Sequence, residues 1–156
     1  MLNINDTAPD FTLYSTSKQP VSLSSLRGKP VVLLFFPAAF TSTCTKELCS
    51  VRDNISFYNM LNAVVYGIST DMVYSLIKFK EEQRLNFDLL SDYNREVIHL
   101  YHTAYETFNF GMRDVAKRSA FVIDAEGKIK YAEVLENASL VPDFEIIEKV
   151  ISALGF

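Results

Sequence analysis

The sequence is poor in cysteine, glycine and proline, with two cysteines, five glycines and five prolines among 156 residues. Low glycine and proline content excludes collagen-like and low-complexity chains. The longest apolar stretch, residues 31–40, falls well short of the roughly 20 residues of a membrane-spanning helix and is broken by Pro37. The net charge is −4 and no long basic run occurs, which argues against nucleic-acid binding. What remains is an ordinary globular composition without a membrane or nucleic-acid partner.

The first eleven residues lack the basic and apolar segments of a signal peptide, so we expect a cytoplasmic protein. Thiols are kept reduced in that compartment. A cysteine pair there is more often catalytic or metal-binding than a structural disulfide. Cys44 and Cys49 are therefore the first candidates for chemistry.

Hydrophobic periodicity predicts alternating strands and helices in one domain over residues 1–156. The expected elements are a hairpin of residues 11–13 and 21–23, a strand over 31–36, a helix over 43–60, a strand over 63–70, a helix over 72–84 capped by Asp71, a short strand within 87–92, a helix over 94–101, a hairpin of 119–124 and 128–134, and a last helix opened by Pro142 and ending near Leu154. Strand–helix–strand units favour parallel pairing, whereas the late hairpin favours an antiparallel edge. The pattern predicts an α/β fold, a three-layer α/β/α sandwich with a mixed central sheet and an N-terminal β-hairpin.

Cys44 follows a buried strand and lies in the first turn of a predicted helix. Unpaired backbone N–H groups and the positive end of the helix dipole favour a thiolate there, and the thiolate is the nucleophilic form. Thr41, one turn upstream, can direct its hydroxyl to the same small volume. Pro37 ends the strand without adding an N–H donor, so it can shape and shield a pocket.

Glu47 lies three residues after Cys44 and shares its helix face. A carboxylate at this place opposes thiolate formation unless a cation offsets it. Arg118, at the start of a predicted strand, can supply that cation through the fold, and Arg52 is the alternative. Spacing along the sequence does not choose between the two arginines.

The segment PAAFTSTC fits the P-x-x-x-T-x-x-C motif and resembles the active-site motif of peroxiredoxins. The segments APDFTL, GKPVVLLFF, FDLLSD and RSAFVIDAEGKI occur in the family's order, so the resemblance covers nearly the whole chain. It implies a thioredoxin-like fold with Cys44 as the peroxidatic cysteine. It also implies supporting roles for Pro37, Thr41 and Arg118, with Glu47 hydrogen-bonded to the arginine.

Cys49, five positions after Cys44, resembles the resolving cysteine of the bacterioferritin-comigratory (Bcp) or PrxQ subgroup, although the loop before Cys44 resembles the one-cysteine AhpE type. In an intact helix, Cα atoms five residues apart are separated by about 8.7 Å, whereas a disulfide needs about 7 Å or less. A disulfide therefore requires the first helical turns to unwind. The resemblance implies that Cys44 reduces hydrogen peroxide and organic hydroperoxides and is itself oxidised to a sulfenic acid. It also implies that Cys49 resolves this acid, and that thioredoxin or a similar dithiol recycles the disulfide.

Other interpretations compete with this one. Cys49 can be a packing residue. A zinc site of Cys44, Cys49, His99 and His102 departs from common spacings, so we expect no metal. Nothing in the sequence suggests an organic cofactor, and we expect none. The aromatic segment 101–110 suggests core or a subunit contact, which leaves monomer and homodimer open. Two other functions are a thiol–disulfide oxidoreductase, which would usually carry C-x-x-C, and a redox sensor or partner-binding protein. Both would react slowly with peroxide, so a fast reaction would exclude them.

Overall fold

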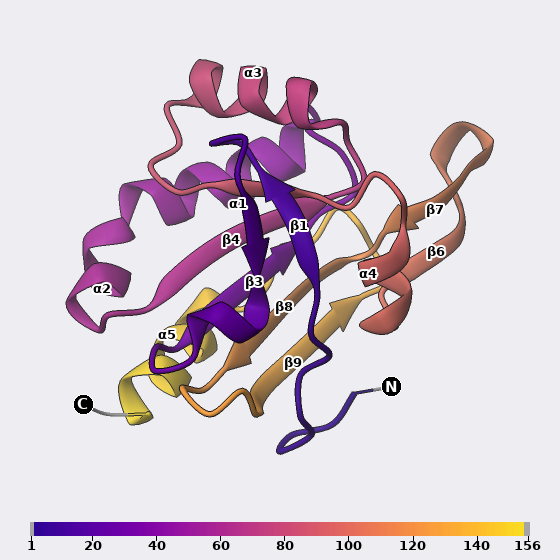
Figure 1. The fold of residues 1–156 in the computed structure, drawn as a ribbon. Coiled ribbons are helices and arrows are strands. Elements are labelled where there is room, and N and C mark those ends of the chain that lie inside the picture. Colours follow the sequence, from indigo (N-terminus) through magenta and orange to yellow (C-terminus); the bar gives the residue numbers. More distant parts are fainter. Residues whose placement is uncertain (1, 155–156) are drawn as a thin grey trace.

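The computed structural model describes residues 2–154, and its centre is a seven-stranded mixed sheet (Figure 1). The strands lie in the order β2-β1-β5-β4-β3-β8-β9. Their bounds are β1 Thr12–Ser15, β2 Pro20–Ser22, β3 Val31–Phe35, β4 Val64–Ser69, β5 Leu89–Ser91, β8 Arg118–Ile123 and β9 Ile129–Leu135. Strands β3, β4 and β5 are parallel, whereas β1 with β2, and β8 with both its neighbours, are antiparallel. The predicted mixed sheet with an N-terminal hairpin is confirmed.

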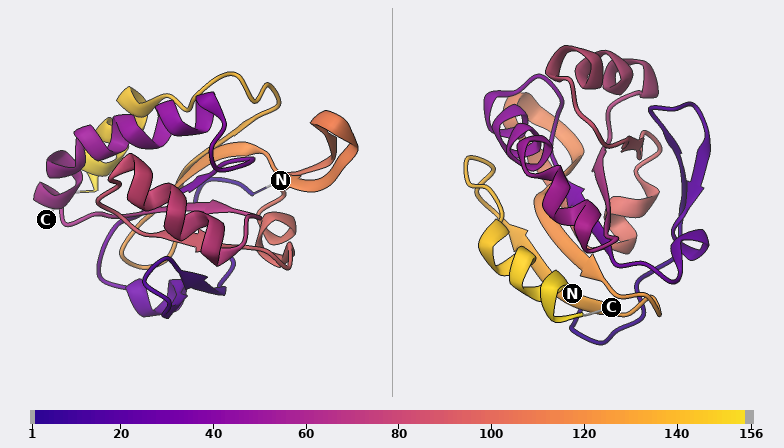
Figure 2. Two further views of the ribbon diagram at one scale, coloured as in Figure 1. Left: turned by 90° about the horizontal axis from the view of Figure 1, so that it is seen from above. Right: turned by 90° about the vertical axis from the view of Figure 1, so that its left-hand side faces the viewer.

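Helices cover the two faces of this sheet unequally (Figure 2). They are α1 Ser42–Asp53, α2 Ile55–Met60, α3 Val73–Gln83, α4 Glu96–Leu100, α5 Phe144–Ala153 and the 3-10 helix η1 Leu23–Leu26. Helices α1, α2, α3 and α5 pack on one face. The other face is covered by α4, η1 and the N-terminal segment. Among residues 2–154, no helix is long and apolar enough to cross a membrane.

The central strand β3 is buried on both sides. Val32 and Leu34 belong to the core cluster under α1, and Val31, Leu33 and Phe35 belong to the opposite cluster. Burying each such side chain stabilises the fold by roughly 1.5–3 kcal/mol, which explains the continuous apolar run in the sequence. The loop that leads from β3 into α1 therefore begins at a strand that is packed on both faces.

The predicted helix over 43–60 is interrupted at Asn54, which ends α1 with φ −119° and ψ 19°. Its side-chain amide donates a hydrogen bond of 2.9 Å to the Glu148 carboxylate on α5. This non-helical residue separates α1 from α2, a break that apolar periodicity alone does not show.

Two predicted helix starts are wrong. Pro142 does not open α5, because Asp143 is the N-cap and its carboxylate accepts from the Ile146 N–H at 3.2 Å. Asp71 does not cap α3 either, since Met72 occupies the N-cap position. The Asp71 carboxylate is engaged elsewhere, in hydrogen bonds to the loop before α1 and to the end of β4.

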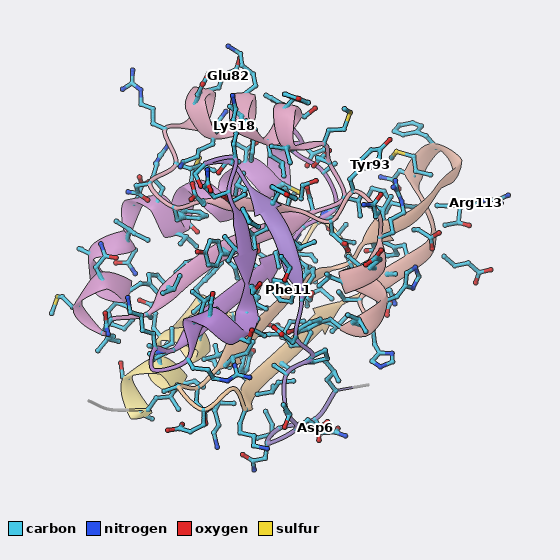
Figure 3. The ribbon with its side chains drawn as sticks, in the orientation of Figure 1. Asp6, Phe11, Lys18, Glu82, Tyr93 and Arg113 are labelled. Carbon is cyan, nitrogen blue, oxygen red and sulfur yellow. The ribbon has the colours of Figure 1, made fainter. Side chains whose placement is uncertain are left out.

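A second, two-stranded sheet consists of β6 Ala104–Phe108 and β7 Met112–Ala116, joined by the 3-10 turn η2 Asn109–Gly111. This hairpin projects from the main sheet, and Arg113 points outward from it (Figures 1 and 3). The sequence patterns did not predict it, because most of its residues are partly or fully exposed and show no clean alternation. Tyr101, just before it, is buried against Phe35 and Phe121, as expected for a core residue.

Candidate active site

Cys44 is the third residue of α1 and is fully buried. Thr41 is the N-cap residue, but its side chain makes no capping hydrogen bond. The first N–H groups of a helix have no partner within the helix, and the helix dipole adds partial positive charge at this end. The sulfur of Cys44 thus lies at the electropositive end of α1, as the sequence predicts.

Strand pairing brings Arg118 to the same place. In the antiparallel register of β3 and β8, Ser119 lies opposite Phe35, so Arg118 lies beside the start of the loop that leads to α1. Arg118 Nη2 donates to Cys44 Sγ at 3.1 Å, and Arg118 Nη1 donates to Glu47 Oε1 at 2.7 Å. The structure thus joins a thiol, a guanidinium and a carboxyl in one buried cluster.

Arg52, the alternative cation, is not part of this cluster. Its Nε atom pairs with Asp53 at 2.9 Å, and its Nη1 atom donates to the carbonyl of Gln83 on α3. Arg118, by contrast, is 1% exposed and is fixed further by two hydrogen bonds to the Ala138 carbonyl, at 3.2 and 3.0 Å. A guanidinium held on several sides keeps a fixed orientation.

The charges of the cluster depend on burial. Burial raises the pKa of Glu47 to about 7, although the neighbouring Arg118 opposes this rise. Within residues 2–154, Glu47 Oε2 is the one buried side-chain oxygen or nitrogen without a hydrogen-bond partner. Burial lowers the pKa of Arg118, but the attraction of Glu47 and Cys44 outweighs it and the net shift is upward. Arg118 therefore stays charged, whereas the Glu47 carboxyl titrates near neutral pH.

A cavity of about 250 Å³ opens beside the cluster. Pro37, Thr41 and Arg118 line it, together with Thr43, the residue before Cys44. The Thr41 hydroxyl donates to the Ala38 carbonyl at 2.8 Å, so it shapes the loop as well as the cavity wall. A small molecule in this cavity would contact the guanidinium that holds the Cys44 sulfur.

The opposite wall of this cavity was not found from the sequence. It is formed by the β6–β7 hairpin and the loop after β9, through Phe108, Asn109, Phe110, Met112, Ala138 and Ser139. The aromatic segment 101–110 was predicted as core or subunit contact, yet Phe108 and Phe110 lie at the candidate site. The one sequence feature that could have indicated this hairpin is Gly111, which lies in its turn with a positive φ of 72°.

Cys49 lies on another side of α1. It is half-buried, and its Sγ is 3.6 Å from Gln83 Oε1 on α3, a weak contact for a thiol donor. Both cysteines are free thiols, and both belong to the uninterrupted helix α1. Because an intact helix keeps residues five apart out of disulfide reach, this is the arrangement expected for the reduced state.

The two histidines, His99 and His102, belong to no cluster of metal ligands in residues 2–154. His99 Nε2 lies 3.3 Å from Asp114 Oδ1, with both side chains half-exposed. In the part of the chain that the structure describes, no three His, Cys, Asp or Glu residues are grouped so as to hold a metal ion. The alternative zinc set of cysteines and histidines therefore does not come together here.

Known proteins are similar to this chain in sequence and in fold. The sequence matches the AhpC/TSA family over residues 4–132. It is 40% identical to a putative peroxiredoxin of Mycobacterium tuberculosis over 133 residues, 85% of each chain, and 37% identical to peroxiredoxin Bcp of Escherichia coli over 131 residues, 83% of this chain and 84% of the relative. The crystal structure of peroxidoxin BcpB from Mycobacterium tuberculosis superposes with a TM-score of 0.83 at 34% identity, over 99% of this chain and 97% of the other. A Xylella fastidiosa PrxQ variant, with a TM-score of 0.87 at 24% identity over 98% and 97% of the chains, shares the fold. The chain therefore belongs to the AhpC/TSA family and is a peroxiredoxin, one of the thiol-dependent peroxidases.

Proposed function

We propose that this chain reduces hydrogen peroxide and organic hydroperoxides at Cys44, resolves the product with Cys49, and is recycled by thioredoxin or a similar dithiol. The observation that carries the proposal is the hydrogen bond of 3.1 Å from Arg118 Nη2 to Cys44 Sγ beside a cavity of about 250 Å³. A buried cation on the sulfur favours the thiolate. The cavity, which Arg118 lines, gives a small peroxide a place against the residue that binds this sulfur.

In the first step, the Cys44 thiolate attacks the terminal oxygen of the peroxide. The S–O bond forms as the O–O bond breaks, and the leaving oxygen departs with the electron pair and takes up a proton, as water or an alcohol. Arg118 is already fixed by Glu47 and Ala138, so it can stabilise the charge on the leaving oxygen without reorganising. Pro37 and Thr41 hold the loop and the cavity wall around the reacting atoms.

In the second step, Cys49 attacks the Cys44 sulfenic acid, the S–S bond forms, and the hydroxyl leaves as water. Both residues lie in α1, so the first turns of this helix must unwind before the sulfurs can meet. An external dithiol then reduces the disulfide through a mixed disulfide. This cycle suits the reducing cytoplasm, where such dithiols are kept reduced.

The test is the intact mass of the fully reduced protein after one equivalent of hydrogen peroxide. We expect the parent chain to lose two hydrogens, which marks the disulfide. A Cys49→Ser variant should gain one oxygen, and a Cys44→Ser variant should show no rapid change.

Each other outcome has a definite meaning. A stable gain of oxygen in the parent would make this a one-cysteine enzyme, with Cys49 a packing residue. Rapid oxidation of the Cys44→Ser variant would contradict the role of Cys44. A dithiol turnover assay completes the test, because the Cys49→Ser variant should lose turnover with thioredoxin while its first step stays intact.

A further inference from the structure

The Asp71 side chain ties the loop before α1 to the central sheet. Its Oδ2 atom accepts a hydrogen bond from the Ala39 backbone N–H at 2.8 Å and another from the Ser69 hydroxyl at 2.7 Å. Ser69 is the last residue of β4, whereas Ala39 lies in the loop between Pro37 and α1. A carboxylate that accepts two hydrogen bonds thus connects the sheet to the segment that carries Cys44.

Asp71 is itself held by the ends of two central strands. Its N–H donates to the Ser69 hydroxyl at 3.2 Å, and its carbonyl accepts from the Ser91 hydroxyl at 2.5 Å. Ser69 is fully buried, and its carbonyl accepts from the Asp92 N–H at 2.7 Å. The backbone of Asp71 is therefore anchored to the ends of β4 and β5 and not to the loop that its carboxylate contacts.

The loop that Asp71 holds contains a strained residue. Phe40, next to Ala39, has a φ of 68°, a left-handed conformation that is unfavourable for an aromatic side chain. Such a conformation persists only where surrounding contacts enforce it. The hydrogen bonds of Ala39 to Asp71 and of Thr41 to Ala38 flank Phe40. The Phe40 ring also packs edge-on against Phe79 of α3, with 5.2 Å between the ring centroids, so these contacts together hold the conformation.

We propose that Asp71 is a positioning residue that latches the loop in the form in which Cys44 faces Arg118. The bond from Ala39 to Asp71 is made in this closed form and breaks when the first turns of α1 unwind to let Cys44 reach Cys49. The second half of this inference rests on the proposed disulfide. Asp71 then favours the first step of the reaction and opposes the second.

Removing the Asp71 carboxylate should change the thiol–disulfide equilibrium in a predictable direction. The reduced, helical form loses the hydrogen bond from Ala39 to the Asp71 side-chain oxygen, whereas the disulfide form has already given it up. Loss of the Asp71 carboxylate therefore shifts the thiol–disulfide equilibrium toward the disulfide. A shift of about tenfold corresponds to about 30 mV toward more negative potential for this two-electron couple.

The test compares Asp71→Ala with the conservative Asp71→Asn, whose side-chain oxygen can still accept from Ala39 and Ser69. Asp124→Ala is the matched control, since the Asp124 carboxylate also accepts two backbone N–H bonds, from Glu126 and Lys128. Asp124 lies in the turn after β8, at the opposite end of that strand from Arg118. If Asp71→Ala does not fold, Ser69→Ala removes one hydroxyl of the same anchor and tests the latch in a milder form.

The first readout is amide hydrogen exchange of residues 38–48 in the fully reduced protein, which needs no peroxide. We expect exchange to be about tenfold faster in Asp71→Ala, near the parent rate in Asp71→Asn, and unchanged in this segment in Asp124→Ala. Parent-like exchange in Asp71→Ala, or equal acceleration in the Ala and Asn variants, would overturn the latch.

The second readout is the equilibrium constant of the Cys44–Cys49 disulfide against a dithiol. We expect Asp71→Ala to favour the disulfide by about tenfold over the parent, with Asp71→Asn and Asp124→Ala close to the parent. Faster exchange with an unchanged equilibrium constant would show that the loop contact is not coupled to the disulfide, and would overturn the inference. If the parent forms no disulfide at all, the resolving role of Cys49 fails, and the exchange data alone decide whether Asp71 holds the loop.

Discussion

The two cysteines of α1 differ in almost everything except their helix. Cys44 is fully buried at the helix start, and its sulfur accepts a hydrogen bond from the Arg118 cation. Cys49, five residues later, is half-buried, and its sulfur lies 3.6 Å from the neutral side-chain oxygen of Gln83. The two thiols therefore differ in burial, in their place along the helix and in the side chain that contacts the sulfur, and we expect their reactivity to follow these differences.

The largest effect should come from removing Arg118, the cation that hydrogen-bonds the Cys44 sulfur. In a Cys49→Ser background, Arg118→Gln should slow oxidation of Cys44 by about 10²–10³-fold, since a fixed donor at the developing charge is lost. The protein should still fold, because the buried Glu47 can take up a proton when its partner is absent. Stopped-flow mixing with hydrogen peroxide measures this rate.

Arg52→Gln in the same background is the matched control, because Arg52 lies on α1 near Cys49 but does not touch Cys44. It should leave the rate within about threefold of the background, as expected for a partly exposed pair. An equal decrease of the oxidation rate in the Arg118→Gln and Arg52→Gln variants would contradict a specific role for the contact between Arg118 and Cys44.

The next effect concerns pH and stability at the Cys44 site. Glu47 has its pKa raised from 4.5 to about 7 by burial, so between these values the folded chain binds more protons than the unfolded chain. The contribution of Glu47 to stability is therefore fully present below about pH 4.5 and is lost as pH rises to about 7, a change on the order of 3 kcal/mol. Glu47→Gln should remove this pH dependence, which urea unfolding at pH 4.5, 6 and 8 would reveal.

Glu145→Gln is the control for this pH series, because Glu145 lies on the exposed surface of α5. Its unfolding free energies should run parallel to those of the parent. If the unfolding free energies of Glu47→Gln also ran parallel to those of the parent across this pH range, burial would not raise the pKa of Glu47.

A smaller effect is expected at Thr41, which shapes the loop and the cavity next to Cys44. Thr41→Val removes the hydroxyl that donates to Ala38, and the loss of one such bond, about 1 kcal/mol, should slow the first step by roughly fivefold. Ser50→Ala deletes a similar bond, from the Ser50 hydroxyl to the Glu47 carbonyl, further along α1. Equal slowing in the two variants would mean that the effect comes from general loosening of the helix.

The smallest effect is expected at Cys49. Gln83→Met removes the oxygen that faces the Cys49 thiol, but this contact is long and thiols are weak donors. The rate of disulfide formation should change by about threefold or less, and the rate of Cys44 oxidation should not change. Peroxide oxidation followed by timed alkylation measures the two rates separately. An equal decrease in the rate of Cys44 oxidation would show that Gln83 affects both cysteines.

Much of the site could be predicted from local signals. The continuous apolar run of β3 and the position of Cys44 at a helix start follow from periodicity and from strand and helix lengths. The choice of Arg118 over Arg52 needed the resemblance to peroxiredoxins or the structure itself. It depends on the antiparallel pairing of β3 and β8, which joins residues more than 80 positions apart.

The rest could not be predicted, for identifiable reasons. Asp71 has the residue type and spacing of an N-cap, but it hydrogen-bonds Ala39, 32 residues away in the sequence. The β6–β7 hairpin supplies a wall of the cavity, yet its strands are largely exposed and carry no strong alternation. Phe110, at its turn, is 97% exposed and has a positive φ, which propensity does not anticipate for an aromatic residue.

The comparison between the two thiols is tested most directly by the peroxide reaction rates of Cys44→Ser and Cys49→Ser, measured side by side with glutathione in the same buffer. We expect Cys49→Ser to react at the parent rate and to consume one peroxide per chain. Cys44→Ser, which keeps only the thiol beside Gln83, should react no faster than glutathione. Equal rates in the two variants, or a fast Cys44→Ser, would contradict the assignment of the peroxidase chemistry to Cys44 and its contact with Arg118.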